Sequence, residues 1–138
     1  MNATFKLEHS EFYKIFDPWR KNQPKDFPKN GVYVVKSNLI VERCLGPDPD
    51  GILYIGQGNI LSYNNRVGKL VNSFNGGLNV HEAGTRYLQN EKLRLKFPIS
   101  SLILEITLPD NHKEMEKDLL KKYLMEFGDI PPLNRIGY

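Results

Sequence analysis

Two short runs of sequence decide the fold: GVYVV at residues 31–35 and ILYIG at residues 52–56. β-Branched and aromatic residues fill both runs, which is typical of β-strands. The segment between them contains GPDPDG at residues 46–51, a composition typical of turns. The simplest local structure is therefore two antiparallel strands joined by a long turn, with one tyrosine on each strand.

The length and the cysteine content set limits on the kind of protein. A chain of 138 residues has the size of one domain with one hydrophobic core. Its single cysteine, Cys44, has no partner for an internal disulfide or a cysteine metal site, which fits a reducing compartment. Charged residues interrupt the apolar positions near the N-terminus, and no apolar run is long enough to span a membrane. We therefore expect a cytoplasmic domain without a membrane partner.

The charge balance is mildly basic, with a formal net charge of +3 and a sequence pI near 8.9. A modest positive excess permits a polyanionic partner but does not require one. The positions of the basic residues are more informative than their number. They gather in residues 20–29, at Arg66 and Lys69, and in residues 86–96.

Residues 1–28 are predicted to form an accessory segment that packs on a main domain of residues 29–138. A short strand or arm is expected near residues 5–7, followed by a helix of about two turns that starts near Ser10, a good N-cap residue. Three prolines, the first of them Pro18, are expected to break this helix into an irregular connector. A surface that binds a partner protein is the alternative role for the helix. Its apolar side consists of Phe12, Ile15, Phe16 and Trp19.

Two helices are expected after the second strand. The first runs from about residue 59 to 75 and ends at Gly76-Gly77, a typical C-terminal signal. Arg66 lies at the edge of its apolar side, where it can bury its carbon stem and direct its guanidinium over the sheet. The second covers residues 82–89, and His81 stands at its start, where a helix N-terminus favours a neutral imidazole. The apolar side of the first helix comprises Ile60, Tyr63, Val67, Leu70, Val71 and Phe74.

A third strand and a last helix complete the pattern. Alternating apolar residues predict a strand over 99–108, and a helix over 112–127, closed by Gly128, follows it. Glu116 falls within the apolar stripe of this helix, where an unpaired buried charge would be costly. Either a structural cation partners Glu116 or the carboxylate faces a bound metal ion. The stripe consists of Met115, Leu119, Leu120, Tyr123 and Phe127.

These elements predict a small α/β domain of the α+β type. We expect a three-stranded antiparallel sheet flanked by helices, in the order β-β-α-α-β-α. The chain then runs through Pro131-Pro132-Leu133-Asn134. The two prolines favour an extended backbone before an asparagine that can both donate and accept hydrogen bonds.

The motifs Gly31-Val32-Tyr33 and Tyr54-Ile55-Gly56 resemble the signature of the GIY-YIG nuclease family. The resemblance extends over about residues 29–136, because further family positions follow in the same order and on the expected elements. It implies a GIY-YIG-like fold and an endonuclease that hydrolyses phosphodiester bonds in DNA. The site residues that it implies are Tyr33, Tyr54, Arg66, His81, Glu116 and Asn134.

The resemblance also implies a role for each group. Glu116 would hold a single Mg²⁺ or Mn²⁺ ion, and magnesium commonly uses just one protein carboxylate. Arg66 would contact the phosphate, and Tyr33 or Tyr54 would act as a general base or pass a proton. The partner would be DNA, either branched or with a specific site, and a homodimer or a protein partner is left open. The residues that would contact nucleic acid are Arg66, Lys69 and Arg86.

Two features depart from the family pattern. The stretch between the tyrosines, residues 34–53, is longer than usual, so residues 37–51 form an inserted acidic turn. Leu70 stands where many family members have a histidine or a tyrosine one turn after the arginine, so His81 or Lys69 would have to substitute for that group. Two alternatives therefore stay open. One is a module of the same fold that binds nucleic acid but cuts it weakly or not at all; the other is a domain that binds proteins through its N-terminal helix.

Overall fold

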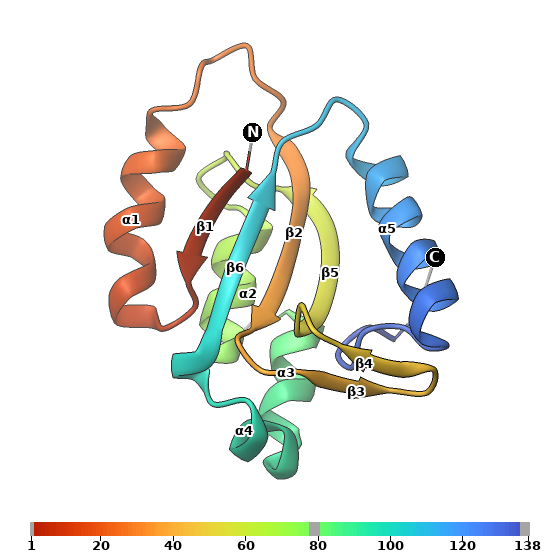
Figure 1. Cartoon of the computed structure of the whole chain (residues 1–138). Coiled ribbons are helices and arrows are strands. Elements are labelled where there is room, and N and C mark those ends of the chain that lie inside the picture. Colours follow the sequence, from red (N-terminus) through yellow and green to blue (C-terminus); the bar gives the residue numbers. More distant parts are fainter. Residues whose placement is uncertain (1, 78–80, 136–138) are drawn as a thin grey trace.

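Four antiparallel strands form the main sheet in the computed structural model, which describes residues 2–77 and 81–135 (Figure 1). The strands span Asn2–Lys6 (β1), Asn30–Ser37 (β2), Ile52–Asn59 (β5) and Leu102–Thr107 (β6), and their order in the sheet is β1-β6-β2-β5. The predicted antiparallel pair β2–β5 is confirmed, and β5 lies at one edge of the sheet. The prediction of three strands is wrong, because the N-terminal residues pair along the otherwise free edge of β6, from Asn2 opposite Thr107 to Lys6 opposite Ile103.

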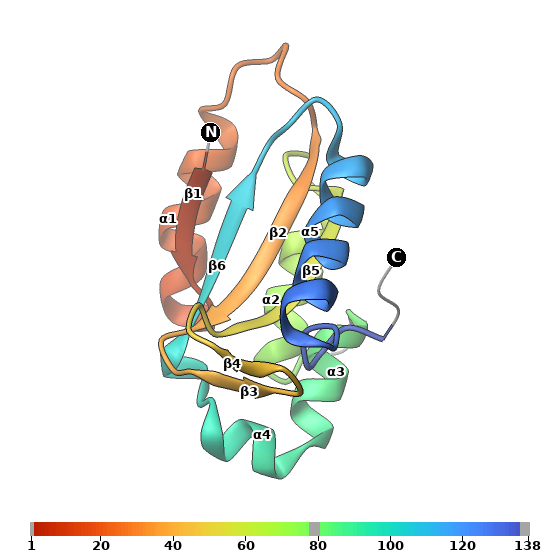
Figure 2. The same cartoon turned by 45° about the vertical axis from the view of Figure 1, so that its right-hand side comes forward.

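Helices cover both faces of the sheet. They span His9–Lys21 (α1), Arg66–Phe74 (α2), Glu82–Gln89 (α3), Glu91–Lys96 (α4) and His112–Phe127 (α5). α1 and α2 lie on one face and α5 lies on the other, as Figures 1 and 2 show. Phe16 and Val71 pack with Tyr33 in the larger core, whereas Leu120 packs with Val32 and Ile55 in a smaller one. Among the described helices, none is both long and apolar enough to cross a membrane.

The inserted segment between the tyrosine strands folds into a small hairpin. Its strands are Val41–Arg43 (β3) and Gly46–Asp48 (β4). The buried carboxylate of Asp48 accepts hydrogen bonds from the backbone N–H groups of Asp50 and Ile52, at 2.9 and 3.0 Å. The Tyr123 hydroxyl of α5 also donates to this carboxylate, at 3.0 Å. Hydrogen bonds to a charged acceptor are stronger than neutral ones, so the insertion is anchored to α5.

α1 is longer than predicted and contains Pro18 within its last turn. A proline removes one helical hydrogen bond, but aromatic contacts hold this turn against β1. The Trp19 ring centroid lies 5.3 Å from that of Phe5 and 5.8 Å from that of Phe16, and each such pair contributes about 0.5–1.5 kcal/mol. The prediction that Ile15 lies on the apolar side is wrong, since this residue is 59% exposed.

α2 begins at Arg66, about two turns later than predicted. Residue 59 instead ends β5, where it pairs with Asn30. The Asn65 side chain then caps α2 by accepting a hydrogen bond from the Gly68 N–H at 2.7 Å. Tyr63 lies in the loop before this cap and is exposed, so its place in the apolar stripe is wrong.

The other bounds differ less from the prediction. Those of α3 and α5 are confirmed, with Gly128 ending α5 in a left-handed conformation. β6 is shorter than predicted because residues 99–101 form a 3₁₀ turn. The buried face of α2 includes four of the predicted stripe residues: Val67, Leu70, Val71 and Phe74.

Candidate active site

Strands β2 and β5 bring the two motif tyrosines together. Tyr33 pairs with Gly56 and Val35 pairs with Tyr54, so both tyrosine side chains leave the same face of the sheet. Their rings stack with centroids 6.1 Å apart and an angle of 29°. A Cβ at position 56 would lie 2.7 Å from a ring carbon of Tyr33 and 2.6 Å from one of Tyr54. Gly56 is therefore required for the two rings to approach in this way.

His81 lies at the start of α3, and its Nε2 is 3.0 Å from the Tyr33 hydroxyl. The other ring nitrogen, Nδ1, accepts a hydrogen bond from the Ala83 backbone N–H at 3.1 Å. A neutral imidazole carries a single N–H, so the proton lies on Nε2 and this nitrogen donates to the Tyr33 oxygen. Burial lowers the pKa of His81 to about 4, with help from the charges of Arg66 and Arg86. His81 is therefore a neutral hydrogen-bond donor near pH 7.

Arg66, the first residue of α2, approaches Tyr33 from the helix. Its carbon stem crosses Gly58, where a Cβ would lie 2.9 Å from the Arg66 Cγ. Its guanidinium hydrogen-bonds the Tyr33 hydroxyl. Burial raises the pKa of Tyr33, while the hydrogen bonds from Arg66 and Tyr54 oppose this rise. The hydrogen bonds from Arg66 and Tyr54 thus favour negative charge on the Tyr33 oxygen, whereas burial, the larger effect, disfavours it.

The two tyrosines differ in how well a phenolate would be held. Burial raises the pKa of Tyr54 strongly, and charge on Tyr33 and Glu116 raises it further. The charges of Arg66 and Arg86 lower the pKa of Tyr54 again, but to a smaller extent. Tyr33, in contrast, receives direct hydrogen bonds. Of the pair, Tyr33 is the better candidate for a group that loses its proton.

Glu116 approaches the tyrosines from the helix on the other face of the sheet. Its carboxylate is half-buried, and burial raises its pKa. The charge of Glu116 raises the pKa values of both Tyr33 and Tyr54, which places it within electrostatic reach of the pair. The ion pairs formed by residues 2–77 and 81–135 do not include Glu116. The sequence analysis left open a cationic side chain that pairs with Glu116 for structural reasons. No such ion pair is found in this part of the chain.

The surroundings of Glu116 suit magnesium better than a metal held by protein ligands alone. Within the described residues, no cluster of three or more histidine, cysteine, aspartate or glutamate side chains is arranged to hold a metal. Mg²⁺ commonly binds one or two carboxylates and completes its coordination with waters and substrate phosphate. A half-buried carboxylate without a paired cation fits that chemistry.

Asn134 holds the C-terminal segment along the edge of β5. Its Oδ1 accepts a hydrogen bond from the Ile55 N–H, and its Nδ2 donates one to the Ile55 carbonyl, both at 2.9 Å. The neighbouring Leu133 N–H donates to the Leu53 carbonyl at 2.8 Å. Arg86 donates through Nε to the Leu133 carbonyl at 2.8 Å. Asn134 thus fastens this segment to β5, and Arg86 fastens it to α3. The roles in catalysis and nucleic-acid binding that the sequence assigned to them stay predictions.

Asn134→Ala is expected to lower the free energy of unfolding by about 1–3 kcal/mol, because it leaves the backbone groups of Ile55 without their partners. Thermal unfolding followed by circular dichroism measures this loss. Asn111→Ala is the matched control, since Asn111 precedes α5 without capping it through its side chain. An unchanged melting temperature together with lost DNA cleavage would instead give Asn134 a direct role in the reaction.

Two other residues of α2 have structural roles, and the first of them, Leu70, lies in the apolar stripe that the sequence predicted. Leu70 is fully buried in the larger core, so packing accounts for its apolar side chain. Ser73 was missed: its buried hydroxyl donates to the His81 carbonyl at 2.7 Å and fixes the start of α3. The available signal was a small polar residue between Val71 and Phe74, near the end of the predicted helix.

Comparisons of the chain with protein-family models, with curated proteins and with solved structures give no match.

The burial of neutral His81 predicts a pH-dependent stability. The pKa of His81 in the fold, about 4, lies below the ordinary value of 6.5, so the unfolded chain binds the proton more readily. The contribution of neutral His81 to the free energy of unfolding is fully present above about pH 6.5. It is lost as the pH falls toward 4, and the loss amounts to up to about 3 kcal/mol. Melting temperatures measured across this range test the prediction.

His81→Asn should flatten this dependence, since asparagine can still cap α3 but does not titrate. His9→Asn, at the exposed start of α1, is the control. Equal slopes for the wild type and His81→Asn would show that His81 is not the group responsible.

Proposed function

We propose that this protein is a metal-dependent endonuclease that hydrolyses phosphodiester bonds in DNA. The observation that carries the proposal is the Tyr33 hydroxyl, which is hydrogen-bonded by His81 and Arg66 within electrostatic reach of the carboxylate of Glu116. A base, a phosphate-binding cation and a metal-binding carboxylate are the groups that phosphodiester hydrolysis needs. The resemblance of the two tyrosine motifs to the GIY-YIG nucleases supports the same reaction.

Tyr33 would serve as the general base that takes a proton from the attacking water. A tyrosine of ordinary pKa is about 3 units from pH 7, which corresponds to about 4 kcal/mol. Burial adds to this cost, since it raises the pKa of Tyr33. Hydrogen bonds to a charged acceptor contribute about 1.5–3 kcal/mol each, so the donors at His81 and Arg66 reduce this cost, but burial outweighs the effect of Arg66 and the pKa of Tyr33 stays raised. The planar guanidinium of Arg66 would also bind a phosphate oxygen.

His81 would position Tyr33 and stabilise its phenolate. It is not a good base, because its only lone pair in the ring plane accepts the Ala83 N–H and its pKa is low. The prediction that His81 could substitute as the proton-transfer group is therefore replaced by one in which it donates a hydrogen bond. Lys69 lies about one turn beyond Arg66 on α2 and is among the residues that line the hollow described below.

Glu116 would hold the metal, Mg²⁺ or Mn²⁺. The ion, when bound, would supply Lewis-acid stabilisation of charge on the phosphate and the leaving oxygen. The chain's own contribution is a carboxylate kept half-buried by α5 and without a cation partner among the described ion pairs. With one such site per chain, a single binding event would nick one strand.

Incubation of the purified protein with supercoiled, linear and branched DNA tests the proposed function. Each substrate is tested with Mg²⁺, with Mn²⁺ and with EDTA. Nicked product in the presence of either metal, absent with EDTA, is the expected result. DNA binding that weakens with salt but yields no product on any substrate would contradict the nuclease and identify a binding module of the same fold. Absence of both binding and cleavage would favour the protein-binding alternative.

A further inference from the structure

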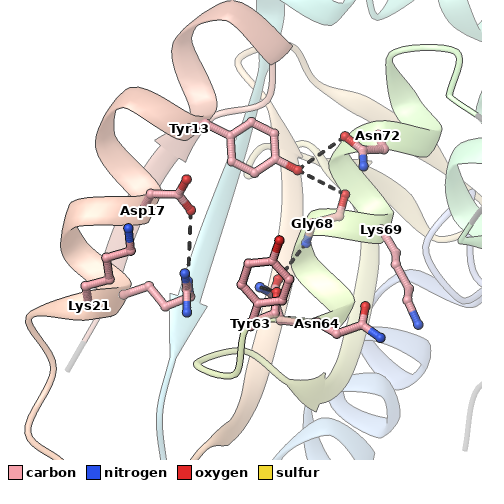
Figure 3. Close-up of a pocket in the computed structure, with 10 residues that line it drawn as sticks. Tyr13, Asp17, Lys21, Tyr63, Asn64, Gly68, Lys69 and Asn72 are labelled. Atoms are coloured by element: carbon pink, nitrogen blue, oxygen red, sulfur yellow. Dashed lines mark hydrogen bonds and ion pairs between the residues drawn. The ribbon is translucent and has the colours of Figure 1, made fainter.

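A polar hollow of about 430 Å³ lies between α1 and α2, and Figure 3 shows it in close-up. Its α1 wall comes from the N-terminal residues that lie outside the GIY-YIG resemblance. The other wall is formed by the start of α2 and the loop before it. Pockets of this size commonly hold small ligands or single ligand groups.

The hollow has an excess of positive charge. Arg20, Lys21 and Lys69 line it, against a single carboxylate from Asp17. The Arg20 side chain is only 12% exposed, and within the described residues its Nε has no hydrogen-bond partner. Asp17 compensates Arg20 weakly, since the two charged groups are 3.9 Å apart. The hollow therefore favours an anionic ligand group.

An aromatic ring stands at the rim of this hollow on a loop fixed by hydrogen bonds. Tyr63 is 92% exposed, and Figure 3 shows its ring between α1 and the start of α2. Asn65 donates to the Ser62 carbonyl at 3.0 Å, and the Ser62 N–H donates to the Asn59 side chain at 3.0 Å. An exposed aromatic ring on a loop held by hydrogen bonds is a suitable surface for stacking a nucleobase.

Fixed amide and hydroxyl groups complete the lining. The Tyr13 hydroxyl, from α1, donates to Asn72 Oδ1 of α2 at 3.2 Å. This hydrogen bond orients the Asn72 amide, so that its NH₂ group is the part left to donate to a ligand. The hollow thus combines cations, a stacking surface and an oriented donor, which are the groups that recognise a phosphate and a base.

We infer that this hollow binds one nucleotide of the DNA strand beside the phosphate that is cleaved. The base stacks on Tyr63, and the phosphate contacts Lys21 and Lys69. Lys69 follows Arg66 by about one turn of α2, about 5 Å along the helix, so a strand held by Arg66 continues directly into the hollow. This inference rests on the proposed function, and it gives the N-terminal segment a role in holding the substrate.

Fluorescence anisotropy of a short labelled single-stranded oligonucleotide, measured in EDTA so that no cleavage occurs, tests the inference. Tyr63→Ala is expected to weaken binding about 5- to 100-fold, whereas Tyr63→Phe, which keeps the ring, binds as the wild type does. Lys21→Glu is expected to weaken binding and to lower the dependence of affinity on salt. Lys122→Glu, an exposed change on α5, is the charge-matched control. Unchanged affinity in both Tyr63→Ala and Lys21→Glu would overturn the inference.

A deoxynucleoside monophosphate serves as competitor in the same assay. Weak competition supports a nucleotide held as part of a strand, and competition as strong as that of the unlabelled oligonucleotide would overturn that assignment. The assay also separates the two proposals. If the wild type cleaves DNA and the variants of the hollow bind DNA normally, the inference alone is overturned. If those variants bind DNA poorly but the wild type does not cleave it, the nuclease function alone is overturned.

Discussion

Glu116→Gln is expected to lower the rate of metal-dependent DNA cleavage by at least about 100-fold. Glutamine keeps the shape of the side chain but has no charge with which to hold a divalent cation. Because Glu116 has no ion-pair partner among the described residues, this change breaks no structural salt bridge. The rate is measured as nicking of supercoiled DNA at saturating Mg²⁺.

The stability of the same variant provides a second readout. Burial raises the pKa of Glu116, so the ionised carboxylate is unfavourable in the fold, and this penalty sets in as the pH rises through the ordinary carboxylate range. The melting temperature of Glu116→Gln at pH 7 should therefore equal or exceed that of the wild type. Glu114→Gln, on the exposed side of α5, is the matched control and should cut normally. Normal cleavage by Glu116→Gln would exclude this carboxylate from the reaction.

Tyr33→Phe is expected to lower the cleavage rate by about 100- to 10,000-fold, the usual contribution of a general base. The variant also leaves the buried Nε2–H of His81 without its acceptor, which should cost about 1–3 kcal/mol of unfolding free energy. Single-turnover cleavage and thermal unfolding measure the two effects. Tyr87→Phe is a suitable control, since Tyr87 also has a buried hydroxyl that donates a hydrogen bond, in this case to the Phe97 carbonyl away from Glu116.

Comparison with Tyr54→Phe assigns the base between the two tyrosines. Tyr54 lacks the direct hydrogen bonds from His81 and Arg66 that Tyr33 receives, so its loss should reduce cleavage less. A larger loss for Tyr54→Phe than for Tyr33→Phe would reverse the assignment.

Local patterns in the sequence predicted those parts of the fold that depend on neighbouring residues. The β-branched runs around Tyr33 and Tyr54 indicate strands without reference to the rest of the chain. The stripe around Glu116, closed by Gly128, likewise indicates a helix whose observed bounds agree with the prediction. The observed contact between Tyr33 and His81 required the resemblance to a family, because nothing local relates residues so far apart.

The parts that were not predicted depend on contacts between distant segments. β1 forms because β6 offers a free edge, which the N-terminal residues alone do not reveal. α2 starts late because residue 59 pairs with Asn30 and so remains in β5. The hydrogen bonds of the Asn134 side chain to the backbone of Ile55 were not predicted, because only the folded chain brings these positions together. The assignment of Asn134 to the reaction stays a prediction.

The most direct test of the account measures cleavage and DNA affinity on the same samples of wild type, Tyr33→Phe and Glu116→Gln. Affinity is determined in EDTA, and single-turnover cleavage is then started by adding Mg²⁺. The proposed mechanism predicts similar DNA affinities for all three proteins and substantial cleavage by the wild type only. Equal cleavage by all three proteins, or tight binding by a wild type that never cuts, would contradict it.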